Sequence, residues 1–155
     1  MSEWKLPWSA SCLCGQVKMR VTAAPLVAMA CHCRGCQKLT SSAYSLTLMI
    51  PPGGFEVIEG APVLGALHRP EAQHYYCPHC KSWLFTTAPG LQGMTNFRPT
   101  MLEDPSWVAP YVESHVGEKL PGVVTGAKHS FPGFPPPERY AELMAGFARE
   151  GARPA

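Results

Sequence analysis

The spacing of the seven cysteines constrains this chain more than any other feature of its sequence. They fall into three groups: Cys12-Leu13-Cys14, the dense run Cys31-His32-Cys33-Arg34-Gly35-Cys36, and Cys77-Pro78-His79-Cys80. Core packing does not explain thiols at such close spacing, and an odd number cannot pair completely into disulfides. In a reducing compartment, clustered cysteines more often bind metal or carry out chemistry than form disulfides.

The two outer pairs together supply four thiolates, from Cys12, Cys14, Cys77 and Cys80. Structural zinc takes four such ligands in a tetrahedron, usually two from each of two tight turns. The sequence therefore predicts a closed structural zinc site that joins the first turn to the second half of the chain. Because this site closes a long loop, it is expected to remove much of the entropy of the unfolded chain.

The central group, Cys31, Cys33 and Cys36, supplies only three thiolates. Three protein ligands leave a fourth position for water or substrate, which is the arrangement of catalytic zinc. We therefore predict a second, open zinc site, which makes two zinc ions per chain. Two alternatives stay open at this point. His32 could complete a second closed site, and Cys33 with Cys36 could form a metal-free redox pair that acts as a thiol switch.

Short apolar segments lie between frequent turn residues, 17 prolines and 14 glycines. Alternating or continuous apolar patterns predict strands at 17–21, 26–31, 43–50, 55–59, 63–67, 73–76 and 83–87, with three more at 91–97, 107–116 and 120–124. A helical turn fits 34–40, and apolar residues at helical spacing predict a C-terminal helix at 138–149. The fold class is therefore mainly β with a short C-terminal helix, in a single domain spanning residues 1–155.

Charge and hydropathy exclude several classes of function. The net charge is +2 and lysine and arginine never form a run, so nucleic acid and membranes are not expected as partners. No apolar stretch reaches the length of a membrane-spanning helix, and the N-terminal residues carry no secretion signal. We therefore expect a cytoplasmic protein. Arg34 and Lys38 flank the central cysteines and could steady an anionic ligand.

Three segments together resemble the glutathione-dependent formaldehyde-activating enzyme family: Cys12-x-Cys14-Gly15, Cys31-His32-Cys33-x-x-Cys36-Gln37-Lys38 and Tyr76-Cys77-Pro78-x-Cys80. The likeness extends over about residues 9–137. It implies an Mss4-like fold, a zinc-stapled β-sheet protein, in which the outer cysteines hold the structural zinc and Cys31, Cys33 and Cys36 hold the catalytic one. The implied activity is the condensation of formaldehyde with glutathione to S-hydroxymethylglutathione, which is classed as a carbon–sulfur lyase reaction.

Two turn residues depart from the family pattern. Lys81 after the last cysteine and Ser41 after Thr40 stand where the family often has glycine. Both are tolerated if they adopt the left-handed backbone conformation. None of the departures replaces a metal ligand.

The sequence thus predicts an enzyme that joins a small thiol, such as glutathione, to an aldehyde, such as formaldehyde. The alternative is a non-enzymatic zinc module that binds another protein. Such a module needs only the structural zinc, so it leaves the central cysteines without a purpose.

Overall fold

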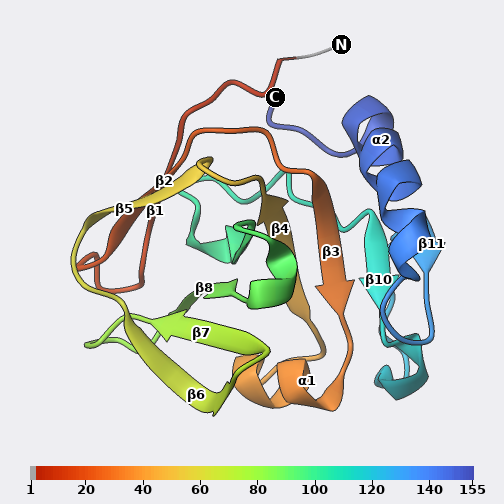
Figure 1. Cartoon of the computed structure of the whole chain (residues 1–155), viewed down its shortest axis with the longest axis horizontal. Coiled ribbons are helices and arrows are strands. Elements are labelled where there is room, and N and C mark those ends of the chain that lie inside the picture. Colours follow the sequence, from red (N-terminus) through yellow and green to blue (C-terminus); the bar gives the residue numbers. More distant parts are fainter. Residues whose placement is uncertain (1–2) are drawn as a thin grey trace.

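The computed structural model describes residues 3–155, and for residues 66–69 it describes the backbone only. An eight-stranded sheet forms the body of the molecule (Figure 1). In spatial order its strands are β11 (His129–Ser130), β10 (Val112–Ser114), β3 (Val27–Cys31), β4 (Ser45–Ile50), β9 (Thr95–Phe97), β8 (Trp83–Thr87), β7 (Ala72–Tyr76) and β6 (Val63–Arg69). A second sheet contains β1 (Trp8–Ser11), β2 (Lys18–Val21) and β5 (Phe55–Glu59).

The helices are few and short. They are α1 (Arg34–Thr40) and α2 (Tyr140–Glu150), with 3-10 turns η1 (Pro89–Leu91), η2 (Pro99–Met101), η3 (Val116–Glu118) and η4 (Pro137–Arg139). None of the helices among residues 3–155 is long and apolar enough to cross a lipid bilayer. The predicted fold class, mainly β with a short C-terminal helix, is confirmed.

Strand pairing is antiparallel except around β10, which pairs in parallel with both β3 and β11. Val112 lies opposite Met29, and Ser114 lies opposite Cys31. Cys31 is the last residue of β3, and α1 begins three residues later (Figure 1). This register places the first thiol of the central group next to a segment more than 80 positions later in the chain.

The alternating apolar and polar residues at 17–21 are alternately buried and exposed, as their pattern predicts. Val17, Met19 and Val21 are fully buried, whereas Lys18 and Arg20 are exposed. Period-two alternation places one face of a strand in the core and the other in water. Lys18 and Arg20 form ion pairs with glutamates of β5 on the outer face.

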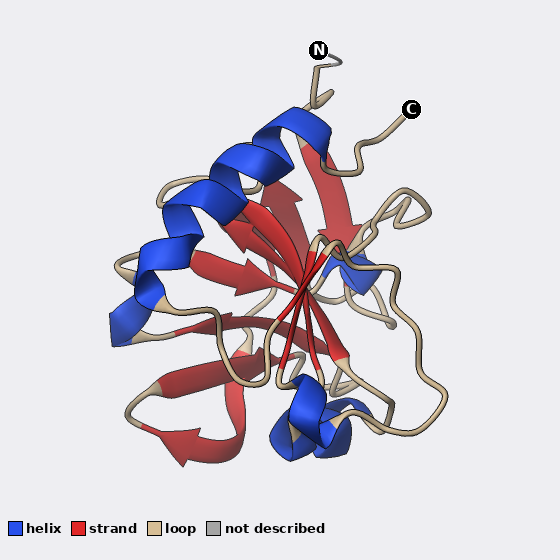
Figure 2. Cartoon of the chain, turned by 90° about the vertical axis from the view of Figure 1, so that its right-hand side faces the viewer, coloured by secondary structure: helices blue, strands red, loops and turns tan. Residues whose placement is uncertain are grey.

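Helix α2 lies across one face of the large sheet (Figure 2). Its Leu143 and Phe147 are buried in the core. Three tryptophans, Trp4, Trp8 and Trp107, gather beside them, with the Trp4 ring centroid 5.7 Å from that of Phe147. The apolar face of α2 thus closes a side of the sheet that would otherwise meet water.

Two strand predictions are too long and a third is wrong. In 91–97 only Thr95–Phe97 is a strand, since Gln92 and Gly93 take the left-handed conformation after η1. In 107–116 only Val112–Ser114 pairs, because Pro110 precedes it and has no N–H to donate. The segment 120–124 forms no strand, and Pro121 with Gly122 turns the chain there.

The buried aromatic contact of α2 generates a stability prediction. We expect Phe147→Ala to lower the free energy of unfolding by about 3–5 kcal/mol, because it opens a cavity among the tryptophans. Urea unfolding followed by tryptophan fluorescence measures the change. Val124→Ala is the control, because Val124 is 87% exposed and its truncation should stay within about 0.5 kcal/mol of the parent. Equal losses in both variants would mean that α2 contributes little to the core.

Candidate metal centres and active site

The central cysteines converge at the junction of β3 and α1. Cys31 ends β3, Cys33 is the N-cap of α1 and accepts a hydrogen bond from the Cys36 backbone N–H at 3.3 Å, and Cys36 lies in the first turn. All three are half-buried, and their Sγ atoms lie within 4.8 Å of one another. The helix cap therefore does two things, since it starts α1 and gathers the three thiols.

The three thiols do not ionise alike. The side-chain hydrogen bond from Cys36 lowers the pKa of Cys31 to about 4, whereas the same contact raises the pKa of Cys36. Burial raises the pKa of Cys33. One thiolate thus shares its charge with two neighbouring S–H groups. Three soft sulfur donors at this separation fit a zinc ion, which prefers thiolate and imidazole ligands.

His32 points away from these thiols. It is fully buried, and its Nε2 lies 2.9 Å from Glu113 Oε2. An extended backbone sends successive side chains to opposite sides, so the imidazole between Cys31 and Cys33 faces the interior. The group of mutually close ligand atoms in the described residues contains the three cysteines without His32. The structure therefore favours an open three-thiol site over one that His32 closes.

Glu113 is the centre of a buried polar network that holds His32. Its carboxylate accepts hydrogen bonds from Thr125 Oγ1 at 2.8 Å and Ser130 Oγ at 2.7 Å, and Lys119 Nζ lies 3.6 Å away. Burial opposes its ionisation, but the hydrogen bonds from Ser130, Thr125 and His32 outweigh burial and lower the pKa of Glu113 to about 2. The carboxylate is therefore ionised at neutral pH and fully partnered.

The outer cysteines form a second cluster. Cys12 and Cys77 are buried, Cys80 is half-buried and Cys14 is exposed, and the four Sγ atoms lie within 4.8 Å of one another. Cys14 Sγ lies 3.8 Å from Cys77 Sγ although the two residues are 63 positions apart in the chain. Four thiols in such a cluster match the donor set of a closed structural zinc site.

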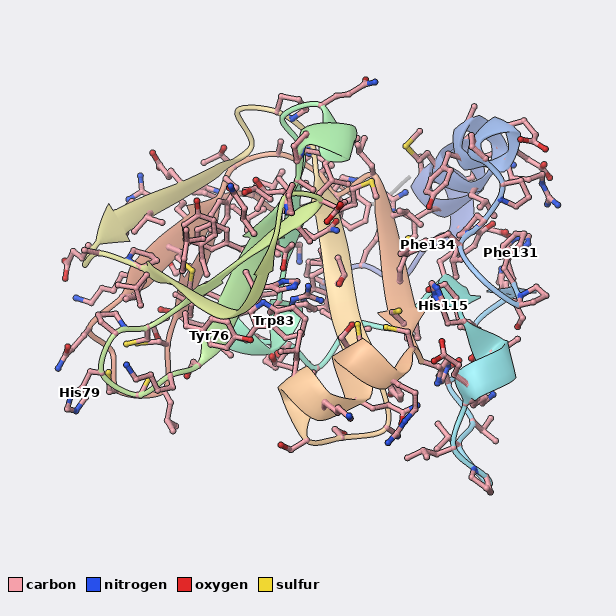
Figure 3. The ribbon with its side chains drawn as sticks, turned by 60° about the horizontal axis from the view of Figure 1, so that its bottom comes forward. Tyr76, His79, Trp83, His115, Phe131 and Phe134 are labelled. Carbon is pink, nitrogen blue, oxygen red and sulfur yellow. The ribbon has the colours of Figure 1, made fainter. Side chains whose placement is uncertain are left out.

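Local backbone geometry brings the outer thiols together. Gly15 has φ +78°, which closes the turn after Cys14, and the Cys77–Cys80 turn joins β7 to β8 as a zinc-ribbon knuckle would. Lys81 has φ 61°, and Ser41, which caps α1, has φ 50°. The left-handed conformation expected where the family often has glycine is thus confirmed at both positions. His79 stands at the edge of the molecule (Figure 3).

His115 is a residue of this site that the sequence alone did not single out. Its Nδ1 lies 3.6 Å from Cys31 Sγ, and its ring meets Phe134 edge to face at 4.5 Å (Figure 3). The residue has φ 55°, an uncommon conformation for histidine. No local spacing links His115 to Cys31, so only the parallel pairing of β10 with β3 could have revealed it.

A cavity of about 500 Å³ opens beside the central thiols. Cys31 and Cys36 line it together with apolar side chains, several polar ones, one arginine (Arg98) and one glutamate (Glu71). Arg34 and Lys38, which the sequence suggested as anion-steadying residues, do not line this cavity, and Arg34 contacts Gln37 and Glu118 instead. A volume of this order suits a small organic ligand.

The fold and its two thiol clusters, one of four cysteines and one of three, place this chain among cysteine-rich β proteins with two candidate metal centres. Residues 7–118 match the family model described as glutathione-dependent formaldehyde-activating enzyme, which covers more than half of the chain. The chain belongs to this family. The matched region includes all seven cysteines and His115, and ends before α2.

The fold is shared with solved structures. A Rhodobacter sphaeroides protein, whose crystal structure comes from a structural-genomics target, is 20% identical with a TM-score of 0.51, over 61% of this chain and 87% of that chain. At that identity the likeness shows the fold alone. A search of curated proteins finds no significant match.

The buried network around Glu113 generates the second prediction. Glu113→Gln keeps the shape of the side chain but removes the charge that faces His32, so we expect the free energy of unfolding at pH 7 to fall by about 3 kcal/mol. Denaturant titration measures the loss. Glu59→Gln is the matched control, because the Glu59–Lys18 ion pair is largely exposed and worth about 0.5 kcal/mol or less. A loss no larger than that of the control would contradict a stabilising role for the network.

Proposed function

We propose that this chain is a zinc-dependent enzyme that joins glutathione to formaldehyde, a carbon–sulfur lyase in the reverse direction. Membership of the family supports the substrate pair. The observation that carries the proposal is the convergence of Cys31, Cys33 and Cys36 at the wall of a cavity of about 500 Å³. A structural metal needs no such cavity, whereas a reacting pair of small molecules does.

The reaction conserves atoms without a further reagent. The thiol sulfur attacks the carbonyl carbon, a carbon–sulfur bond forms, and the carbon–oxygen π bond breaks. The proton of the thiol ends on the former carbonyl oxygen, which gives S-hydroxymethylglutathione. The reaction needs the thiol as thiolate, held close to the aldehyde, so orientation and stabilisation of charge are what a protein can add.

Each cysteine cluster has its own role in this proposal. A structural zinc ion would be held by the outer cluster, Cys12, Cys14, Cys77 and Cys80. A catalytic zinc ion would be held by Cys31, Cys33 and Cys36. A zinc ion with an open position lowers the pKa of a bound thiol and polarises a carbonyl oxygen. The chain contributes the thiols at fixed separation and a cavity whose walls are largely apolar.

The residues behind the central thiols position them. Glu113 holds His32, and the backbone N–H of His32 donates to the Ser114 carbonyl at 3.0 Å, which fixes the segment between Cys31 and Cys33. His115 contacts Cys31 directly, with its Nδ1 3.6 Å from the Cys31 Sγ. We also infer a cytoplasmic location, since thiols that hold metal must stay reduced.

Metal analysis tests the two-site arrangement. We expect two zinc ions per purified chain, and we expect glutathione to perturb only the site formed by the central cysteines. Elemental analysis gives the zinc count, and X-ray absorption at the zinc edge before and after addition of glutathione reports the sulfur ligands. A single, firmly held zinc ion that ignores glutathione would favour the non-enzymatic binding module.

Two serine variants separate the clusters. Cys33→Ser should lose one zinc ion per chain and glutathione binding, with the fold retained. Cys77→Ser should lower the free energy of unfolding by several kcal/mol, because zinc binding in the closed site is coupled to folding. Circular dichroism and zinc content are measured for both. If Cys33→Ser unfolds as Cys77→Ser does, the central cysteines are structural and the proposal fails.

A further inference from the structure

Three buried polar atoms beside the cavity have no hydrogen-bond partner. In the part of the chain that the structure describes, the unpartnered buried side-chain atoms are His32 Nδ1, Trp83 Nε1, Asn96 Oδ1 and Arg98 Nε. The last three belong to residues that line the cavity next to Cys31 and Cys36. Leaving a buried donor or acceptor unpaired is unfavourable, so a cluster of three such atoms in one cavity favours the binding of a polar ligand there.

Arg98 is the most constrained of the three. It follows β9, it is only 8% exposed, and its guanidinium carbon lies 3.6 Å from the centroid of the Trp83 ring. Its Nη1 donates to the Leu46 carbonyl and to Thr47 Oγ1, and its Nη2 donates to Thr86 Oγ1 at 3.1 Å. These neutral acceptors and the indole ring hold the side chain in one orientation.

Arg98 is a buried cation, and the one glutamate among the described residues that line its cavity, Glu71, forms no ion pair with it. In the described part of the chain, none of the ion pairs involves this residue. Burial lowers the pKa of Arg98, with opposing contributions from Cys36 and Cys31, to about 10, so the guanidinium stays charged at neutral pH. An arginine has five N–H donors, and the three hydrogen bonds above leave two of them free. A planar carboxylate fits such a pair of donors.

The rest of the lining narrows the class of ligand. Met29, Met49, Leu91 and Phe134 give the cavity an apolar wall, while the Asn96 carbonyl oxygen offers an acceptor and the Trp83 indole offers a donor. Trp83 and Arg98 also line a second cavity of about 480 Å³. The central thiols and Asn96 line only the first cavity, so the ligand belongs there. Trp83 is buried and lies near the centre of the view in Figure 3.

We propose that Arg98, supported by Trp83 and Asn96, is the specificity-determining residue that binds a carboxylate of the thiol substrate. The substrate class is an anionic, peptide-like thiol, in which one carboxylate pairs with Arg98 and an N–H group donates to Asn96 Oδ1. The thiol of the same molecule reaches Cys31 and Cys36 at the other part of the wall. This inference rests on the proposed function and adds how the thiol is selected.

The first test changes the substrate and leaves the protein intact. Glutathione, its glycyl monoethyl ester and its diethyl ester are titrated calorimetrically into the zinc-loaded protein. We expect the diester, which has no carboxylate, to bind roughly 10- to 100-fold more weakly than glutathione, since a hydrogen bond to a charged group is lost. The monoester then shows which carboxylate is recognised.

Each outcome of this titration separates the two proposals. If the wild-type protein binds neither glutathione nor its esters, the proposed function fails and this inference fails with it. If the diester binds as well as glutathione, thiol binding stands and carboxylate recognition is overturned.

The second test assigns the effect to Arg98. In Arg98→Met the affinities for glutathione and for the diester should become equal, and Arg98→Lys should keep part of the preference for glutathione. Arg20→Met is the matched control, because Arg20 is an exposed arginine paired with Glu56 on the other sheet, and it should keep the full preference. If the preference persists in Arg98→Met, another residue binds the carboxylate and Arg98 only balances the charge of the thiols.

A conservative variant guards against misfolding of the arginine variants. Trp83→Phe keeps an aromatic ring beside Arg98 and removes the indole N–H together with part of the stacked ring surface. We expect it to weaken glutathione binding about 5-fold, the effect of one neutral hydrogen bond, while circular dichroism stays unchanged. Unchanged affinity in this variant would remove Trp83 from the proposed site. If the arginine variants also unfold, the comparison of glutathione with its diester on the wild-type protein still decides the proposal.

Discussion

The meeting of distant cysteines is the constraint on which the rest of this structure depends. The outer cluster ties the turn after β1 to the turn between β7 and β8, so the small sheet is held against the far end of the large one. With so few helices, the chain has little local structure to organise it, and most of its pairing joins segments far apart in sequence. A metal ion that closes such a long loop supplies order that local propensity does not.

Two buried charged residues, Glu113 and Arg98, lie near the central cysteines, and they differ in whether the protein supplies a partner for the charge. Glu113 is surrounded by partners, so its charge is satisfied within the protein and contributes to stability. Arg98 is held by neutral acceptors and an aromatic ring, so its charge stays available. A satisfied charge positions the thiols, while an unsatisfied one selects what approaches them. Both the framework and the specificity of the site therefore rest on residues that line the protein interior.

Much of the fold could be predicted from the sequence, because period-two patterns such as Val17, Met19 and Val21 report directly on burial. The spacing of the cysteines likewise indicated both clusters, although which ions they hold stays a prediction, as does the single-domain organisation. The predicted strands that proved wrong were those where a proline or a left-handed residue interrupts an apolar run, and the short strands β1 and β11 were not predicted. Arg98 and His115 could not be found, since single residues joined to the site only by strand register leave no local pattern.

The alternation at Cys31-His32-Cys33 has a mechanical consequence. One short stretch of backbone presents sulfur atoms on one side and a buried imidazole on the other, and that imidazole is fastened to Glu113 of β10. Any shift of the sulfur atoms that turns this backbone must also turn the imidazole against a strand clamped between β3 and β11. The thiols are therefore held by the pairing of β3 with β10, although Cys31 is the last residue of its strand. In the proposed zinc site, this coupling would let ligands exchange on the ion while the sulfur atoms keep their places.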